Sequence, residues 1–403
     1  MALSGSIILL FVLATVVALL AKRLRVPYTV ALVVAGLVLG SVGGLRPPVL
    51  TKELLFALFL PGLLFEAAFH LDAEEFWRNR LTIFSLALPG VVAATILTAG
   101  ALVAALRLAG AESHLGWGPA FVFATLIAAT DPIAVVAVVR TLGAPARLGV
   151  LIEGESLLND GTAAASFGIA VTYVLEAQPQ TVSLVVDFLY LIVGGVIIGG
   201  VIGLLTWKLA ARVDDPMLMI TLTTTAAYGS FLIGEGSQTS GVIATVTAGL
   251  LSGNRASLEG MAPSIRASVQ AFWEYVAFAL NSLVFLLVGF QARVPSLIAE
   301  WRPIVIAYLV VTLSRTVVTY GLNAVHPKDE RLSREWTAVL TWSGLRGSLA
   351  MVLALSLPLT MPQRDLVVTI TVGVVVLSIL VQGLTVRPLL RWLRIAGPST
   401  ANV

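Results

Sequence analysis

The chain has 403 residues, of which 58% are hydrophobic and only 12% charged, and its formal net charge is +3. This charged fraction and a mean hydropathy of +0.97 exclude an ordinary soluble protein, in which about a quarter of the residues are charged. The pattern indicates an all-α polytopic membrane protein. No nucleic-acid partner is expected, because the cations lie in short runs between apolar segments, and the absence of cysteine excludes thiolate metal sites.

Apolar segments separated by short polar turns run along the chain, and a membrane-crossing helix needs about 20 apolar residues. We predict thirteen spans, at about residues 5–22, 27–45, 52–71, 79–108, 117–140, 147–177, 183–212, 216–233, 240–253, 266–292, 301–325, 335–358 and 363–396. No basic region precedes the first apolar run and no small-residue cleavage site follows it. We therefore expect a retained span and not a removed signal peptide.

The basic residues between the spans predict the orientation. An odd number of spans places the two termini on opposite sides of the membrane. With the N-terminus outside, 17 of the 25 Lys and Arg residues lie inside and 6 outside, while Arg315 and Arg346 lie within spans. Because cytoplasmic loops carry the excess of positive charge, we predict a multi-pass protein of the cell membrane with a cytoplasmic C-terminus.

The fifth and twelfth spans are each interrupted near their middle. The fifth contains Thr130-Asp131-Pro132, and the twelfth contains Gly344-Leu345-Arg346-Gly347. Proline removes a backbone donor and glycine weakens a helix, so both spans are expected to break there. These spans correspond in a six-plus-one-plus-six arrangement, which predicts two inverted six-helix repeats whose broken helices cross, and not two ordinary kinks. Asp131 and Arg346 would then compensate the partial charges of the half-helix ends.

The sixth span carries polar side chains inside an apolar helix. Glu155, Ser156, Asn159 and Asp160 are spaced three to four residues apart, so we expect them on one broad helix face. A charge near the bilayer centre costs at least about 2.5 kcal/mol, and such groups normally have a partner or face water. Their oxygens, with a carbonyl from the unwound Thr130, suit a small hard cation for which a proton competes. The alternative is permanent pairing with a buried arginine, which we expect for Glu155.

Five motifs spread over almost the whole chain resemble the signature set of a known family. They are Phe65-Glu66, Thr130-Asp131-Pro132, Gly154-Glu155-Ser156-Leu157-Leu158-Asn159-Asp160-Gly161, Ser314-Arg315 and Gly344-Leu345-Arg346-Gly347. The set is similar to that of sodium/proton antiporters, specifically the prokaryotic branch of the monovalent cation:proton antiporter-1 family, which is related to the animal exchangers. Only nine residues follow Arg394, so we expect no regulatory tail of the animal kind.

The resemblance implies a role for each matching position. Asp160 would bind cation and proton alternately, and four positions would complete or gate the cation site: Asp131, Ser156, the Thr130 carbonyl and Glu66. Three further residues, Glu155, Arg315 and Arg346, would form the buried ion pairs that hold the broken spans.

Asn159 bears on stoichiometry, because electrogenic relatives carry a second Asp at this position. The resemblance implies that the Asn form exchanges one cation for one proton. It also implies a homodimer, in which residues 1–72 and 183–293 form a scaffold and residues 79–178 and 301–396 form a core that moves as an elevator. Na⁺, or another monovalent cation, and H⁺ would be the transported substrates, and no cofactor is expected.

The same residues also bear on other functions. An intramembrane metalloprotease or serine protease would need His-Glu-x-x-His or Gly-x-Ser-x-Gly, and neither occurs. A retinal-linked or ATP-driven pump would need a mid-span lysine or a phosphate-binding loop. A cation channel uses buried acids too, but normally repeats a short filter around a symmetry axis. Exchange of K⁺ for H⁺ is the open alternative to Na⁺, because the ligand types do not decide between the two ions.

Overall fold

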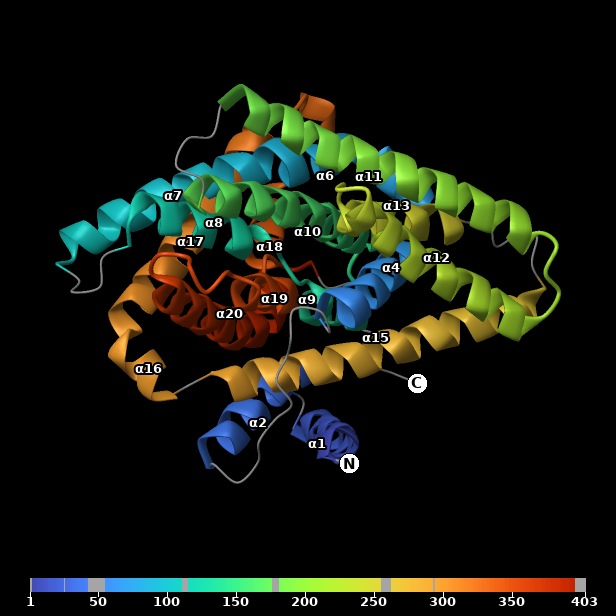
Figure 1. Cartoon of the computed structure of the whole chain (residues 1–403), viewed down its shortest axis with the longest axis horizontal. Helices are drawn as coiled ribbons and strands as arrows, with labels where there is room; N and C mark the ends of the chain where they lie inside the picture. Colours follow the sequence, from blue (N-terminus) through green and yellow to red (C-terminus); the bar gives the residue numbers. More distant parts are fainter. Residues whose placement is uncertain are drawn as a thin grey trace.

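A computed structural model of the chain describes residues 2–24, 26–42, 55–110, 115–175, 181–254, 262–292 and 294–395. Within these ranges every regular element is a helix (Figure 1). In the first half the elements are α1 (Ala2–Leu24), α2 (Tyr28–Val42), η1 (Leu55–Phe59), α4 (Leu60–His70), α5 (Ala73–Arg78), α6 (Arg80–Ser85), η2 (Leu86–Gly90), α7 (Val91–Leu108), α8 (Trp117–Ala128), α9 (Ile133–Thr141) and α10 (Ala146–Leu175).

The second half begins with a 30-residue helix, α11. Its elements are α11 (Thr181–Ala210), α12 (Pro216–Gly236), α13 (Gly241–Ser252), α15 (Pro263–Gln291), α16 (Val294–Ala299), α17 (Trp301–Val325), η3 (Lys328–Glu330), α18 (Arg334–Trp342), α19 (Ser348–Leu355) and α20 (Arg364–Trp392). Among the described residues, seven helical segments are long and apolar enough to cross a membrane, and three shorter apolar helices accompany them. The helices follow the thirteen predicted spans in order, which confirms the polytopic all-α prediction.

The two predicted interruptions are real breaks in the helices. The fifth span divides into α8 and α9, with residues 129–132 between them, and the twelfth divides into α18 and α19, with residues 343–347 between them. Proline also marks the fourth span, where Pro89 lies in the π-helical turn η2 between α6 and α7. A missing backbone donor is accommodated there by a wider turn and not by a break.

The helices pack in two groups. In one group α11 packs against α13, α13 against α4, and α15 against α2, with α1 beside α2 and α15. In the other group α8 packs against α7 and α10, while α17 packs against α7 and α20. In Figure 1, α11 runs along one long edge of the molecule and α15 along the opposite edge, with α1 and α2 outside α15. The broken spans lie between these edges.

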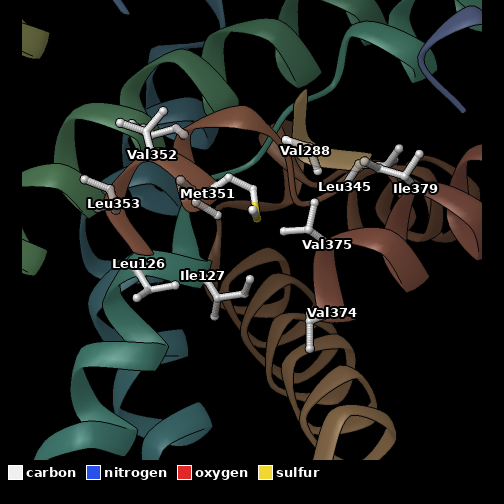
Figure 2. Packing of buried hydrophobic residues seen from close by; sticks show 14 of the residues in the cluster. Leu126, Ile127, Val288, Leu345, Met351, Val352, Leu353, Val374, Val375 and Ile379 are labelled. Atoms are coloured by element: carbon white, nitrogen blue, oxygen red, sulfur yellow. The ribbon is translucent and has the colours of Figure 1, made fainter. Parts of the chain in front are cut away.

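Buried aliphatic side chains enclose the region of the breaks. Figure 2 shows the residues that meet there from four helices and the second break: Leu126, Ile127, Val288, Leu345, Met351, Val352, Leu353, Val374, Val375 and Ile379. Lipid tails are as apolar as leucine, so in a bilayer such contacts stabilise the fold through close packing and not through transfer from water. This dense packing fixes the backbone around the polar residues at the breaks.

The orientation of the chain in the membrane stays a prediction. Several of the basic residues on which it depends, Arg25, Arg46, Lys52, Arg255 and Arg293, lie outside the described residues.

Candidate functional site

The breaks of the fifth and twelfth spans meet in the interior. The backbone N–H of Asp131 donates to the carbonyl of Leu345 at 2.7 Å. The Nη1 of Arg346 donates to the carbonyls of Ala128 and Ala129, at 2.9 and 3.3 Å. The unwound segments therefore satisfy each other's backbone groups, as non-helical chain within a membrane requires. This is the predicted crossing of two broken helices.

The charged residues at the crossing lie at helix ends of opposite sign. Arg346 contacts the last carbonyls of α8, where the helix dipole is negative. The Oδ1 of Asp131 accepts a hydrogen bond from the backbone N–H of Ile133, the first residue of α9, at 3.3 Å. The backbone N–H of Ser348, the first residue of α19, also approaches the Asp131 carboxylate. One aspartate thus faces two positive helix ends, as the sequence predicts for this pair of breaks.

Glycines at the second break allow this close approach. A Cβ atom on Gly347 would overlap the Cβ of Asp131, and one on Gly344 would overlap the guanidinium of Arg315. Any other residue would force the neighbouring charged side chain to shift. The two glycines therefore do more than weaken the twelfth span, because each leaves room for one charged residue of the site.

Ser156 joins the first break to α10. Its Oγ donates to the carbonyl of Thr130 at 2.6 Å and accepts a hydrogen bond from the Thr130 Oγ1 at 3.1 Å. The Thr130 backbone N–H approaches the carboxylate of Asp160, one turn further along α10. The Oδ1 of Asp160 is buried and accepts no hydrogen bond from the part of the chain described. An unpaired carboxylate oxygen therefore lies beside the crossing.

A cavity of about 400 Å³ opens beside this oxygen. Asp131, Ser156 and Asp160 line it from the crossing, and Glu66 of α4 lines it from the other helix group. Five carboxylates face the cavity: Glu66, Asp131, Glu153, Asp160 and Glu274. A low-dielectric cleft with this many acids concentrates cations near its walls.

Ion pairs lie at the outer part of the cavity. Arg140, at the end of α9, bonds Glu153 at 2.6 Å, and the Nδ1 of His70 lies 3.2 Å from Glu66. The Arg140 side chain is 67% exposed, so the cavity leads toward the surface at the end of α9. Asp160 and Asp131 lie deeper and have no such partner among the described ion pairs.

The expectation of one broad ligand face on α10 is wrong. Ser156 and Asp160 line the 400 Å³ cavity, whereas Glu155 and Asn159 line a separate cavity of about 30 Å³. Successive residues of a helix point about 100° apart, and the crossing packs between the two stripes. The small cavity has room for about one water molecule, and the Oδ1 of Asn159 has no hydrogen-bond donor among the described residues.

Glu155 forms its ion pair with Arg315. The Nη1 and Nη2 of Arg315 donate to the two carboxylate oxygens at 2.9 and 2.8 Å, and the Nδ2 of Asn159 donates to the Glu155 Oε1 at 2.5 Å. The prediction of a buried pair for Glu155 is confirmed. The partner is Arg315 and not Arg346, because the carbonyls of α8 take the hydrogen bonds of Arg346.

The signature motifs do not include two residues of α15 that also line the cavity, Glu274 and Asn281. The signal in the sequence was a polar residue in the middle of an apolar span, as in Phe-Ala-Leu-Asn-Ser-Leu-Val-Phe. Sequence alone does not tell which face of a long helix looks into a cavity, so this signal could not place either residue at the site.

Comparisons with known proteins place the whole sequence in a family. The family described as "Sodium/hydrogen exchanger, transmembrane" matches residues 8–392. The chain is 38% identical to the Na(+)/H(+) antiporter ApNhaP of Aphanothece halophytica over 93% of its own length and 71% of the relative's. It is 35% identical to the Na(+)/H(+) antiporter NhaH of Halobacillus dabanensis, over 96% of both chains.

A solved structure has the same fold. The sodium proton antiporter MjNhaP1 of Methanocaldococcus jannaschii, determined at pH 8, superposes with a TM-score of 0.80 at 17% identity. The match covers 98% of this chain and 99% of that one. By sequence over nearly its whole length and by fold, the chain belongs to the transmembrane sodium/hydrogen exchanger family.

Proposed function

We propose that the protein exchanges Na⁺ for H⁺ across the membrane, with Asp160 binding the two ions in alternation. The observation that carries the proposal is the buried Oδ1 of Asp160, which has no hydrogen-bond partner among the described residues, in a side chain that lines an acid-rich cavity. A carboxylate oxygen that no protein group occupies can bind a cation or a proton, but not both at once. This exclusion couples the two fluxes, because an empty carboxylate is costly to move through the membrane interior. The named activity of the relatives supports the same reaction.

The cation ligands that we propose are oxygens from both sides of the cavity. Asp160, Asp131 and Ser156 would bind from the crossing together with the Thr130 carbonyl, which accepts one hydrogen bond from Ser156 and has a second lone pair. Glu66 would bind or gate from α4. Such a set of hard oxygen ligands suits an alkali cation. Because the set is compact, Na⁺ and Li⁺ should be transported in preference to K⁺.

The test is Asp160→Asn in sealed proteoliposomes. The amide keeps the size of the side chain but cannot titrate, so Na⁺-driven proton flux should disappear while folding is preserved. Asp365→Asn is the matched control, because the Asp365 side chain is 99% exposed. Flux that persists in the Asp160 variant would exclude Asp160 as the shared site. In the wild type, the apparent Na⁺ affinity should also weaken as the pH falls, because a protonated carboxylate does not bind the cation.

Asn159 supports an electroneutral exchange of one Na⁺ for one H⁺. Its amide is neutral, lies outside the larger cavity and bonds Glu155. The initial rate of Na⁺-driven pH change should therefore not depend on a membrane potential imposed with a potassium ionophore. A rate that changes with the sign of the potential would show that net charge moves in each cycle.

We further propose that the two helix groups are a scaffold (residues 1–72 and 183–293) and a mobile core (residues 79–178 and 301–396). The cavity lies between them, with Ala277 of α15 on one side and Ala350 of α19 on the other, which supports this division. Cross-linking a cysteine pair at these positions should stop transport. A pair within the scaffold, at Leu63 and Ala277, should not. The absence of native cysteine makes both experiments direct.

The excess of basic residues supports an N-terminus outside the cell and a cytoplasmic C-terminus. The cavity leads to the surface near Arg140, which this orientation places on the cytoplasmic side. The cavity would therefore open to the cytoplasm. Membrane-impermeant labelling of a single cysteine at Arg140 in intact cells tests the orientation. The cysteine should be unreactive until the cells are permeabilised.

We also propose a homodimer. The outer face of α1 exposes large apolar side chains, including Ile8, Val12 and Leu19, and is suited to either lipid or a second protomer. Single-molecule photobleaching of labelled protein in bilayers should give two bleaching steps. A single step at all protein-to-lipid ratios would contradict the dimer.

A further inference from the structure

Asn281 lies in the middle of α15, within the scaffold side of the cavity. The residue is only 6% exposed. Its Oδ1 is buried and has no hydrogen-bond donor among the described residues, although the side chain lines the same cavity as Asp131 and Asp160. Buried amide oxygens in proteins are nearly always paired, so a group of this kind requires an explanation.

The position of Asn281 on α15 follows from helical spacing. Glu274, Ala277, Phe278 and Asn281 all line the cavity, and their offsets of three, four and seven residues place them on one helix face. Seven residues correspond to about 10 Å along the axis, so Asn281 lies roughly two turns from Glu274. The ring of Phe278 between them stacks on Tyr28 of α2, with centroids 5.6 Å apart.

The core side of the cavity faces Asn281 with the crossing. The helix α19 packs against α15, and its first residues, Ser348 to Ala350, line the cavity. Ser348 is also the residue whose backbone N–H approaches Asp131. Asp160 and Asn281 therefore line one cavity from opposite helix groups, and each carries a buried Oδ1 that has no donor among the described residues.

The size of the cavity determines what can satisfy both oxygens. A volume of about 400 Å³ is far larger than a bare alkali ion and holds on the order of ten water molecules. Water bound to a cation is a strong donor, because the ion polarises its O–H bonds. A neutral amide oxygen can accept such a bond without adding charge. It would thus strengthen cation binding while the charge moved in each cycle stays the same.

We propose that the Asn281 amide oxygen binds the hydrated cation from the scaffold side, by accepting a hydrogen bond from a water of its hydration shell. This role rests on the proposed Na⁺/H⁺ exchange and adds one residue to it. Asn281 belongs to the half of the site that does not move with Asp160. It therefore holds the ion only while the cavity is in the state seen here, and transport carries the ion away from it.

The test compares Asn281→Leu with the wild type in proteoliposomes. Leucine has a similar volume but no oxygen, so the KM for Na⁺ should rise about three- to tenfold, the value of one hydrogen bond, with kcat nearly unchanged. The thermal stability should not fall, since replacing an unpaired buried acceptor by an apolar group is neutral or stabilising. An increase in KM that is accompanied by a marked loss of stability would indicate a structural role and overturn the proposal.

A second pair of variants keeps the test valid if leucine does not fit. Asn281→Ser and Asn281→Ala differ only by a hydroxyl oxygen, so the serine variant should have at least a twofold lower KM for Na⁺. Ser282→Ala is the matched control, because Ser282 bonds Tyr28 and does not line the cavity. Equal KM values for the serine and alanine variants would exclude the amide oxygen as a ligand. Asp160→Asn, measured in parallel, tests the exchange itself, so failure of the two proposals is distinguishable.

Discussion

Replacement of the buried Arg315 by leucine should destabilise the protein more than the loss of an exposed arginine. Arg315 holds both carboxylate oxygens of Glu155 and donates to the carbonyls of Leu340 and Thr341 at 2.9 and 3.2 Å. The side chains of Arg315 and Glu155 are only 11% and 4% exposed. In the leucine variant Asn159 is the one donor that remains to the buried carboxylate among the described residues, and two carbonyls at the end of α18 lose a partner.

The magnitude follows from the burial of this pair. Truncating one member of a buried pair costs about 3 to 5 kcal/mol, because the other charge remains in the interior. Removing both charges avoids this penalty. The double variant Arg315→Leu/Glu155→Leu should therefore be more stable than Arg315→Leu alone, although it contains one more substitution. With the single variant Glu155→Leu also measured, the departure of the double variant from the sum of the two single effects gives the coupling of the two side chains.

The assay is unfolding of purified protein in detergent, followed by tryptophan fluorescence and by loss of the monodisperse peak in size exclusion. Arg78→Leu is the control, because Arg78 is 73% exposed and its pair with Glu75 is worth at most about 1 kcal/mol. If Arg315→Leu is no more destabilising than this control, or if the double variant is the least stable of all, then Glu155 and Arg315 do not form a structural ion pair.

Three further variants test two residues of the site and one residue outside it, His326 at the end of α17. Gly347→Ala should displace Asp131, lower the stability by about 1 to 3 kcal/mol and reduce transport, which unfolding and flux assays would detect. Ser156→Ala removes the donor to the Thr130 carbonyl and a cation ligand, so the KM for Na⁺ should rise; an unchanged KM would argue against Ser156 as a ligand. Burial lowers the pKa of His326 below its ordinary value of 6.5, so the unfolded chain binds a proton at this residue more readily than the folded protein. The stability should therefore fall as the pH drops below about 6.5. Melting of His326→Gln should depend less on pH between 7.5 and 5.5 than melting of the wild type.

Much of the architecture could be predicted from the sequence, because the signals are local. The length of each apolar run determines whether a helix can cross the bilayer, and proline or paired glycines determine where the backbone cannot continue as a helix. These effects act within a few residues, and a bilayer offers the chain few other structures. The thirteen spans and the breaks at Asp131 and Arg346 can therefore be predicted from the sequence alone.

Only the tertiary structure decided how the side chains face one another. The rotation of α10 about its axis, which separates Ser156 and Asp160 from Glu155 and Asn159, is set by the packing of the crossing and of the neighbouring helices. The choice of Arg315 as the partner of Glu155 depends on the same packing. Asn281 is more than a hundred residues from Asp160 in the chain and reaches the cavity only because α15 lies against α19. Such contacts join distant segments, and the local pattern of one helix contains no information about which neighbour will lie beside each of its faces.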